Sequence, residues 1–152
     1  MNDAQKLGWL FDIEQIKQLK HRYCGYCDEG YDADGIAALF VEDGVWDGGP
    51  FGTYHGRAAI HAFFAGASKL ISFANHYVSN PVIDIEGDIA HGRWDLWQPM
   101  VNEPAHRAAW LVAKYRDTYV RTAGGWMFQR LTVDVRALSP YEEGFARQRF
   151  LT

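Results

Sequence analysis

The chain is poor in the residues that build several common kinds of functional site. It has two cysteines among 152 residues, a formal net charge of −4, and no long apolar run near its N-terminus, where the stretch from Leu7 to Phe11 is flanked by polar residues. Cys24 and Cys27 form a single Cys-x-x-Cys inside a helical pattern, which favours small core side chains over a redox or zinc site. Because acids and bases are interspersed along the chain, we expect no nucleic-acid partner and no binding to a membrane surface. Because no apolar run is long enough for a signal peptide or a transmembrane helix, we expect a cytoplasmic protein.

Phosphate-binding and metal-binding patterns are also missing. The sequence has no glycine-rich phosphate loop and no cluster of arginines, which argues against a nucleotide or sugar-phosphate ligand. No pair of its six histidines has the spacing and acidic companion of a metal site. We therefore predict neither a metal nor a cofactor.

Aromatic residues, in contrast, are abundant: six Trp, eight Tyr and nine Phe make up 15% of the chain. After Asp88 the alternation of a β-strand predicts which side chains face the core. The more apolar, inward set is Ala90, Gly92, Trp94 and Leu96. Core packing would also account for the aromatic residues, but small residues beside large flat ones favour a slot for an apolar or aromatic ligand.

Hydrophobic periodicity changes once along the chain, from helical to extended. Asp12-Ile-Glu-Gln15 resembles a capping box and predicts the start of a long first helix. The remaining expected elements are a helix around 36–40, a helix after Gly56 up to Ala67, short strands at 44–47 and 51–54, and long β segments at 73–85, 88–99, 107–121 and 125–138. This order predicts an α+β fold over a single domain, residues 1–152, with three N-terminal helices packed in a curved, mostly antiparallel sheet.

Asp28 and His76 are the leading candidates for catalysis. Asp28 follows Tyr23-Cys-Gly-Tyr-Cys near the end of the first helix, and His76 lies in Asn75-His-Tyr-Val-Ser-Asn80-Pro81 on a predicted strand. A carboxylate that orients an imidazole can remove a proton near neutral pH. Tyr23 is a candidate hydrogen-bond donor, although its five-residue offset puts it about 140° around the helix from Asp28. The structural alternatives stay open: Asp28 only ends the helix, and His76 is only a half-buried histidine.

Nearly the whole chain, roughly residues 10 to 140, resembles the SnoaL-like branch of the NTF2-like superfamily. The matching segments are Asp28–Phe40, Glu42–Trp46, Gly56–Ile60, His76 with Asn80-Pro81, Gly87-Asp88, Tyr115–Tyr119 and Gly125-Trp126. The resemblance implies a cone-shaped α+β fold that encloses a ligand pocket.

It also implies a chemistry. Asp28 and His76 match the Asp–His dyad of hexachlorocyclohexane dehydrochlorinase, and with Tyr23 they match catalytic positions of bile-acid 7α-dehydratase; scytalone dehydratase is similar in arrangement. These enzymes are cofactor-free lyases, so the resemblance implies elimination of water or hydrogen halide from a small hydrophobic cyclic or aromatic molecule. The predicted substrate-binding residues are Trp46, Phe64, Trp94, Leu96, Tyr115 and Arg130. Arg136 competes with Arg130 for the basic position on the last strand.

Two other functions remain open. Asp47 and Asp117 lie near the acids of ketosteroid isomerases, which share the fold, and favour a proton-shuttling isomerase; a ligand-binding module without catalysis needs neither Asp28 nor His76. Outward-facing Trp97, joined by Trp110, marks an interface and predicts a homo-dimer or homo-trimer. The segment 141–150 is expected to cover the pocket mouth or to contact a neighbour.

Overall fold

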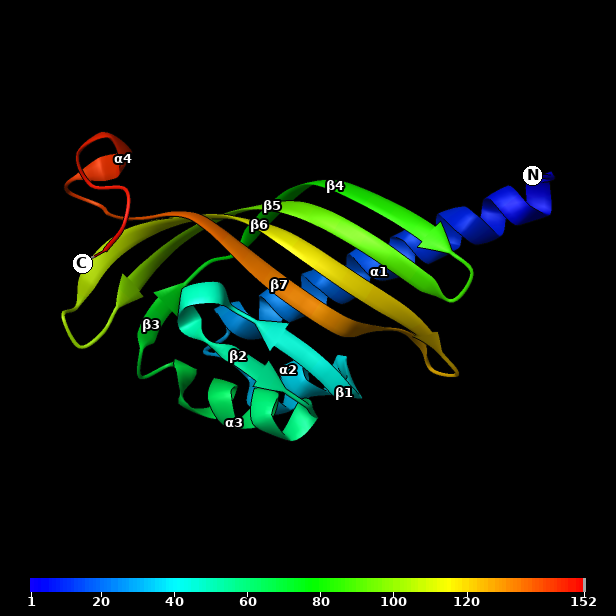
Figure 1. Ribbon diagram of the computed structural model, residues 1–152, viewed down its shortest axis with the longest axis horizontal. Helices are drawn as coiled ribbons and strands as arrows, with labels where there is room; N and C mark the ends of the chain where they lie inside the picture. The colour runs from blue at the N-terminus through cyan, green and yellow to red at the C-terminus, as the bar shows by residue number, and fades with distance from the viewer. Residues whose placement is uncertain (152) are drawn as a thin grey trace.

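A long helix lies on the concave side of a strongly curved sheet in the computed structural model, which describes residues 1–151 (Figure 1). In chain order the elements are α1 (Asp3–Asp28), α2 (Ala33–Ala38), β1 (Phe40–Asp47), the 3-10 turn η1 (Gly49–Phe51), β2 (Thr53–His55), α3 (Arg57–Ala67), β3 (Ile71–Ala74), β4 (Tyr77–Glu86), β5 (Ile89–Asn102), β6 (Arg107–Thr122), β7 (Gly125–Pro140) and α4 (Gly144–Arg147). The predicted α+β class is therefore confirmed. Among the described residues no helix is both long enough and apolar enough to span a bilayer.

Helix α1 begins earlier than predicted. The capping box is formed by Asn2 and Gln5, whose side chains each accept a hydrogen bond from the other residue's backbone N–H. Asp12 lies inside the helix, where its carboxylate accepts two hydrogen bonds from Arg121, of 2.7 and 2.8 Å, and one from the Trp126 indole. The pattern at Asp12 thus marked a tertiary contact with the adjoining ends of β6 and β7. The preceding turns of α1 extend past the sheet (Figure 1).

The short elements also differ in their bounds from the predicted ones. Leu39 caps α2, and Phe40 already belongs to β1, so the second helix is shorter and the first strand longer than the periodicity suggested. Phe51 belongs to η1 and not to the strand that follows. Helix α3 has the predicted position, with Ile60, Phe64 and Ala67 on its buried side.

The seven strands form one sheet in the order β2-β1-β7-β6-β5-β3, and β4 pairs with β5 beside β3. All pairings are antiparallel except that of β1 with β7, so the sheet is mostly antiparallel as predicted. The predicted 73–85 strand is in fact two strands, β3 and β4. Asn75 and His76 form the connection between them, and this break in the ladder frees His76 from strand pairing.

The inward face of β5 is the predicted one: Ala90, Trp94 and Leu96 are buried, and Gln98 and Met100 continue the pattern. Gly92 does not leave a slot, however. A Cβ atom at Gly92 would lie 2.8 Å from the Tyr119 ring, so Tyr119 fills that space. The ligand space therefore lies farther along the cone, past Trp94.

A buried ion pair fills the same closed end of the cone. Lys20 on α1 donates a 2.9 Å hydrogen bond to the carboxylate of Asp117 on β6, and both side chains are fully buried. The hydroxyl of Tyr119 donates to the same Asp117 oxygen, and the Trp94 indole donates to Tyr119. This network joins α1 to the sheet at its centre.

Candidate active site

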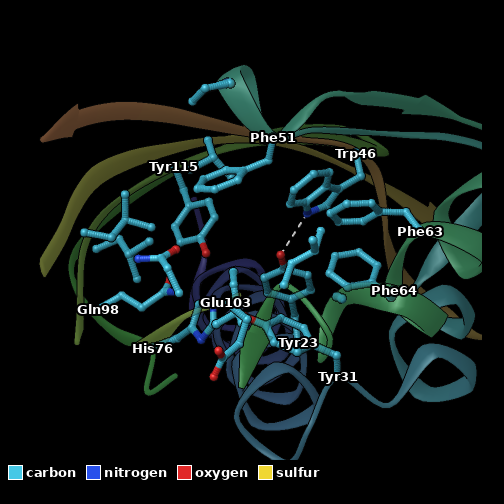
Figure 2. Close-up of a pocket in the computed structure, with 18 residues that line it drawn as sticks. Tyr23, Tyr31, Trp46, Phe51, Phe63, Phe64, His76, Gln98, Glu103 and Tyr115 are labelled. Atoms are coloured by element: carbon cyan, nitrogen blue, oxygen red, sulfur yellow. Dashed lines mark hydrogen bonds between the residues drawn. The ribbon is translucent and has the colours of Figure 1, made fainter. Parts of the chain in front are cut away.

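A cavity of about 350 Å³ opens between α1, α3 and the inner face of the sheet. Figure 2 shows it divided into two halves: an aromatic side with Trp46, Phe63 and Phe64, and a more polar side with His76 and Gln98. The other lining residues are Tyr23, Tyr31, Pro50, Phe51, Ala67, Leu70, Ile71, Leu96, Asn102, Glu103, Leu111, Tyr115 and Val133. An apolar cavity with a few convergent polar groups is the usual form of a small-molecule site.

Asp28 and His76 meet at the inner wall of this cavity. The Asp28 Oδ1 atom lies 2.6 Å from Nδ1 of the His76 ring and accepts a 2.8 Å hydrogen bond from the His76 backbone N–H. The backbone bond is possible because His76 lies in the β3–β4 connection, where no strand partner takes its N–H. One carboxylate oxygen therefore fixes both the backbone and the ring of His76.

This contact also sets the roles of the two ring nitrogens. Because a carboxylate accepts hydrogen bonds, Nδ1 carries the proton, and Nε2 is then the basic nitrogen of the neutral ring. His76 lines the cavity, whereas Asp28 lies behind it and does not. The arrangement can accept a proton at Nε2 while Asp28 stabilises the resulting imidazolium.

Tyr23 reaches the cavity independently of Asp28. Its hydroxyl accepts a 2.8 Å hydrogen bond from the Trp46 indole, which leaves the hydroxyl proton for another acceptor. Burial raises the pKa of Tyr23 well above its ordinary value, so the hydroxyl stays a donor at physiological pH. The angular offset between Tyr23 and Asp28 on α1 is accommodated because the Tyr23 side chain enters the cavity from α1, whereas His76 enters it from the β3–β4 connection.

Tyr31 is a cavity residue that the sequence did not indicate. Its ring stacks on Phe64 and stands nearly perpendicular to the His76 ring, at centroid distances of 6.0 and 6.4 Å. It adopts a left-handed backbone conformation with φ of 60°, which is uncommon for a residue with a large side chain. Such strained positions concentrate at functional sites, but no sequence signal marks them.

Four of the six predicted substrate-binding residues line the cavity: Trp46, Phe64, Leu96 and Tyr115. Trp94 does not, because its indole is bonded to Tyr119 at the closed end. Arg130 does not either, because it lies on the outer side of β7, where it donates a 2.6 Å hydrogen bond to Asp47. Val133 of the same strand lines the cavity instead.

The acids proposed for an isomerase also lie outside the cavity. Asp47 accepts hydrogen bonds from Arg130, Thr53 and the Gly49 backbone, and these bonds lower its pKa. Asp117 is engaged by Lys20. Neither carboxylate is in a position to exchange protons with a molecule in the cavity.

A second Asp–His pair provides an internal comparison. His61 Nε2 lies 2.7 Å from the Asp34 carboxylate, but both side chains are on the surface, 45% and 94% exposed. The two dyads have similar distances, and only that of His76 borders the enclosed cavity. Within residues 1–151, no group of three or more His, Cys, Asp or Glu side chains is arranged to hold a metal ion.

The polar residues at the other end of the cavity were also missed. Gln98 continues the inward alternation of β5, so the sequence pattern was sufficient to find it. Asn102 and Glu103 lie where β5 ends and the chain turns. Their positions depend on pairing with β3, which the sequence did not separate from β4.

Comparison with known proteins agrees with this architecture. The profile of the SnoaL-like domain family matches residues 10–132, so the chain belongs to that family and to the NTF2-like superfamily. A comparison with curated proteins finds no match.

Three solved structures illustrate the similarity. A candidate aromatic ring hydroxylase from Novosphingobium aromaticivorans is 30% identical, with a TM-score of 0.79 over 86% of this chain and 94% of that one. A candidate scytalone dehydratase from the same species is 25% identical, with a TM-score of 0.79 over 87% and 89%. A hexachlorocyclohexane dehydrochlorinase from Novosphingobium barchaimii LL02 is 19% identical, with a TM-score of 0.77 over 91% and 94%, and shows the shared fold alone.

Proposed function

We propose that the protein is a cofactor-independent lyase that eliminates water or hydrogen halide from a small hydrophobic cyclic or aromatic substrate. The observation that carries the proposal is the 2.6 Å contact between Asp28 and the His76 ring at the wall of an aromatic cavity. The similarity to the candidate scytalone dehydratase, at 25% identity, supports the same class of chemistry.

In the proposed reaction, Nε2 of His76 removes a proton from the carbon next to the one that bears the leaving group. The electrons of the C–H bond form the new double bond, and the leaving group departs with the electrons of its own bond. Asp28 stabilises the imidazolium formed. The Tyr23 hydroxyl donates a hydrogen bond to the departing oxygen or halide, whose negative charge grows in the transition state. When the leaving group is hydroxide, the proton that completes water comes back from the imidazolium.

Mass spectrometry of the products tests this proposal. Wild-type protein and His76→Ala are incubated with a panel of hydroxylated and halogenated cyclic compounds, including steroids. We expect a neutral loss of water or hydrogen halide with the wild type only. A product of unchanged mass and new retention time would establish the isomerase instead. Binding without turnover of any compound would identify a binding module.

We propose as well that the protein forms a homo-dimer or homo-trimer through the outer face of the sheet. Trp97 and Trp110 stack there at 4.9 Å, and Phe145 and Tyr141 from the C-terminal segment pack against them. Thus the C-terminal segment covers the outer sheet face, and none of its described residues lines the cavity. Aromatic clusters of this kind, partly exposed, are typical of protein interfaces.

Substitution at the centre of this patch tests the association. Trp97→Lys places a charge in the proposed interface, so we expect light scattering to give the mass of one 17.3 kDa chain for the variant and a multiple of it for the wild type. Lys69→Ala, a change at an exposed position in the turn after α3, serves as the control. A wild-type protein that already has the mass of one chain would refute the proposal.

A further inference from the structure

The side chains that line the cavity include an acidic group but no lysine or arginine. Among its lining residues Glu103 is the single carboxylate, and none is a lysine or an arginine. Burial raises the pKa values of the Tyr23 and Tyr115 hydroxyls, so these groups stay neutral. Arg130, the basic residue expected near the site, is bonded to Asp47 outside the cavity. An anion that enters therefore meets a carboxylate, and no lysine or arginine lines the cavity to offset its charge.

The Glu103 carboxylate is held in one orientation. Its Oε1 atom lies 2.6 Å from the Ser72 hydroxyl and 2.8 Å from Nδ1 of His106. Both bonds stabilise the ionised form and lower the pKa of Glu103. They occupy one oxygen, and Oε2 has no hydrogen-bond partner within the described chain. The backbone N–H of Glu103 is fixed as well, by a 2.8 Å bond to the carbonyl of Leu70.

The residue before Glu103 supplies a hydrogen-bond donor that has no partner within the described residues. The Nδ2 atom of Asn102 is buried and makes no hydrogen bond within residues 1–151, although a buried polar group normally has a partner. Asn102 lines the cavity next to Glu103 at the end of β5. A hydroxyl is the simple group that satisfies both, since it donates one hydrogen bond and accepts others. An ammonium group only donates, and a carboxylate only accepts.

We propose that Glu103 is a specificity-determining residue, which with Asn102 binds a hydroxyl group on the ring of the substrate and excludes anionic compounds. The proposal uses the same cavity as the proposed lyase and deepens it by naming the substrate class: a neutral, hydroxylated cyclic or aromatic compound. Figure 2 shows Glu103 and His76 on the same side of the cavity, away from Trp46, Phe63 and Phe64. A ring that stacks on those aromatic side chains thus directs its polar substituent toward Glu103.

Calorimetric binding of three matched probes tests the inference without any turnover. The probes are 2-naphthylmethanol, 2-naphthylmethylamine and 2-naphthoate, which share one ring system and differ in charge. For the wild type at low salt we expect the alcohol to bind most tightly and the carboxylate roughly tenfold more weakly, because like charges repel where salt screens them little. Raising the NaCl concentration should reduce the difference in affinity between the alcohol and the carboxylate for the wild-type protein, because salt screens the repulsion.

Glu103→Gln keeps the shape of the side chain and removes the charge. It should bring the carboxylate to within about threefold of the alcohol, whereas Glu86→Gln, an exposed site on β4, should leave the order unchanged. Unchanged unfolding midpoints confirm that both variants fold.

Three results would overturn the inference: equal binding of alcohol and carboxylate by the wild type, a carboxylate-to-alcohol ratio that Glu103→Gln does not alter, or failure of all three probes to bind. If the amine bound more tightly than the alcohol, attraction between opposite charges would explain the binding better than recognition of a hydroxyl group. The proposed substrate class would then be wrong. Repeating the titrations with His76→Ala separates this inference from the proposed lyase reaction. Because binding does not require proton abstraction, we expect this variant to bind the three probes in the same order as the wild type.

Discussion

Replacing His76 by alanine is expected to lower kcat by about 10³-fold to 10⁴-fold on any substrate that the wild type converts by elimination. A positioned general base accounts for rate factors of this order, and no other lining residue combines a basic nitrogen with a carboxylate partner. KM should change much less, since the aromatic side of the cavity remains intact. Steady-state kinetics with the compound identified by mass spectrometry measures both constants.

Asp28→Asn should lower kcat by about 10²-fold to 10⁴-fold for a related reason. The amide group of asparagine can donate to Nδ1, which moves the ring proton to Nε2 and removes the base. His61→Ala is the matched control: it breaks a second Asp–His contact of similar length, 2.7 Å, on the surface. If His76→Ala retained more than a tenth of the wild-type kcat, or if His61→Ala lost as much, the proposed base would be wrong.

Replacing Asp117 by alanine is expected to lower the free energy of unfolding by about 3–5 kcal/mol, the usual effect of removing one partner from a buried ion pair. The substitution leaves the ammonium group of Lys20 fully buried and without its 2.9 Å partner. Burial lowers the pKa of Lys20, and an unpaired Lys20 would lose its proton more readily still. Urea unfolding followed by tryptophan fluorescence measures the change.

Two further variants show whether the loss comes from the unpaired charge. Lys20→Met combined with Asp117→Asn removes both charges and should recover most of the stability, because a neutral pair carries no comparable desolvation penalty. Asp134→Ala breaks the exposed 3.8 Å contact with Arg116 and should change stability by less than about 1 kcal/mol. Equal losses for Asp117→Ala and Asp134→Ala would contradict this explanation of the closed end.

Much of the candidate site was predictable because it depends on local patterns. The alternation along β5 identified Leu96 as inward-facing and extends to Gln98, and the helical spacing after Gly56 identified Phe64. The same patterns cannot distinguish a buried residue in the filled end of the cone from one in the cavity. Trp94 and Leu96 share a face of one strand, yet Tyr119 covers the first and the cavity borders the second.

Arg130 shows a second kind of limit. A basic residue on the last strand was expected near the cavity, but the register of β7 changes opposite Thr118 and Tyr119. Since a shift of one residue moves a side chain to the other face of a strand, such an irregularity decides which residues point inward. Arg130 consequently meets Asp47 on the outer face, and Val133 takes an inward position.

By itself the sequence determined the α+β class, the order of the long elements apart from the break between β3 and β4, the inward face of β5 and the identity of Asp28 and His76 as candidates. The single-domain organisation and the cytoplasmic location stay predictions. Tertiary structure decided what long-range contacts control: that Asp28 fixes His76 across 48 positions, that Lys20 and Asp117 fill one end of the cone, and that Asn102 and Glu103 line the cavity. Periodicity along a chain shows which side of a helix or strand is buried. A site depends on which of these buried sides face one another, and strand register and the breaks between strands determine this.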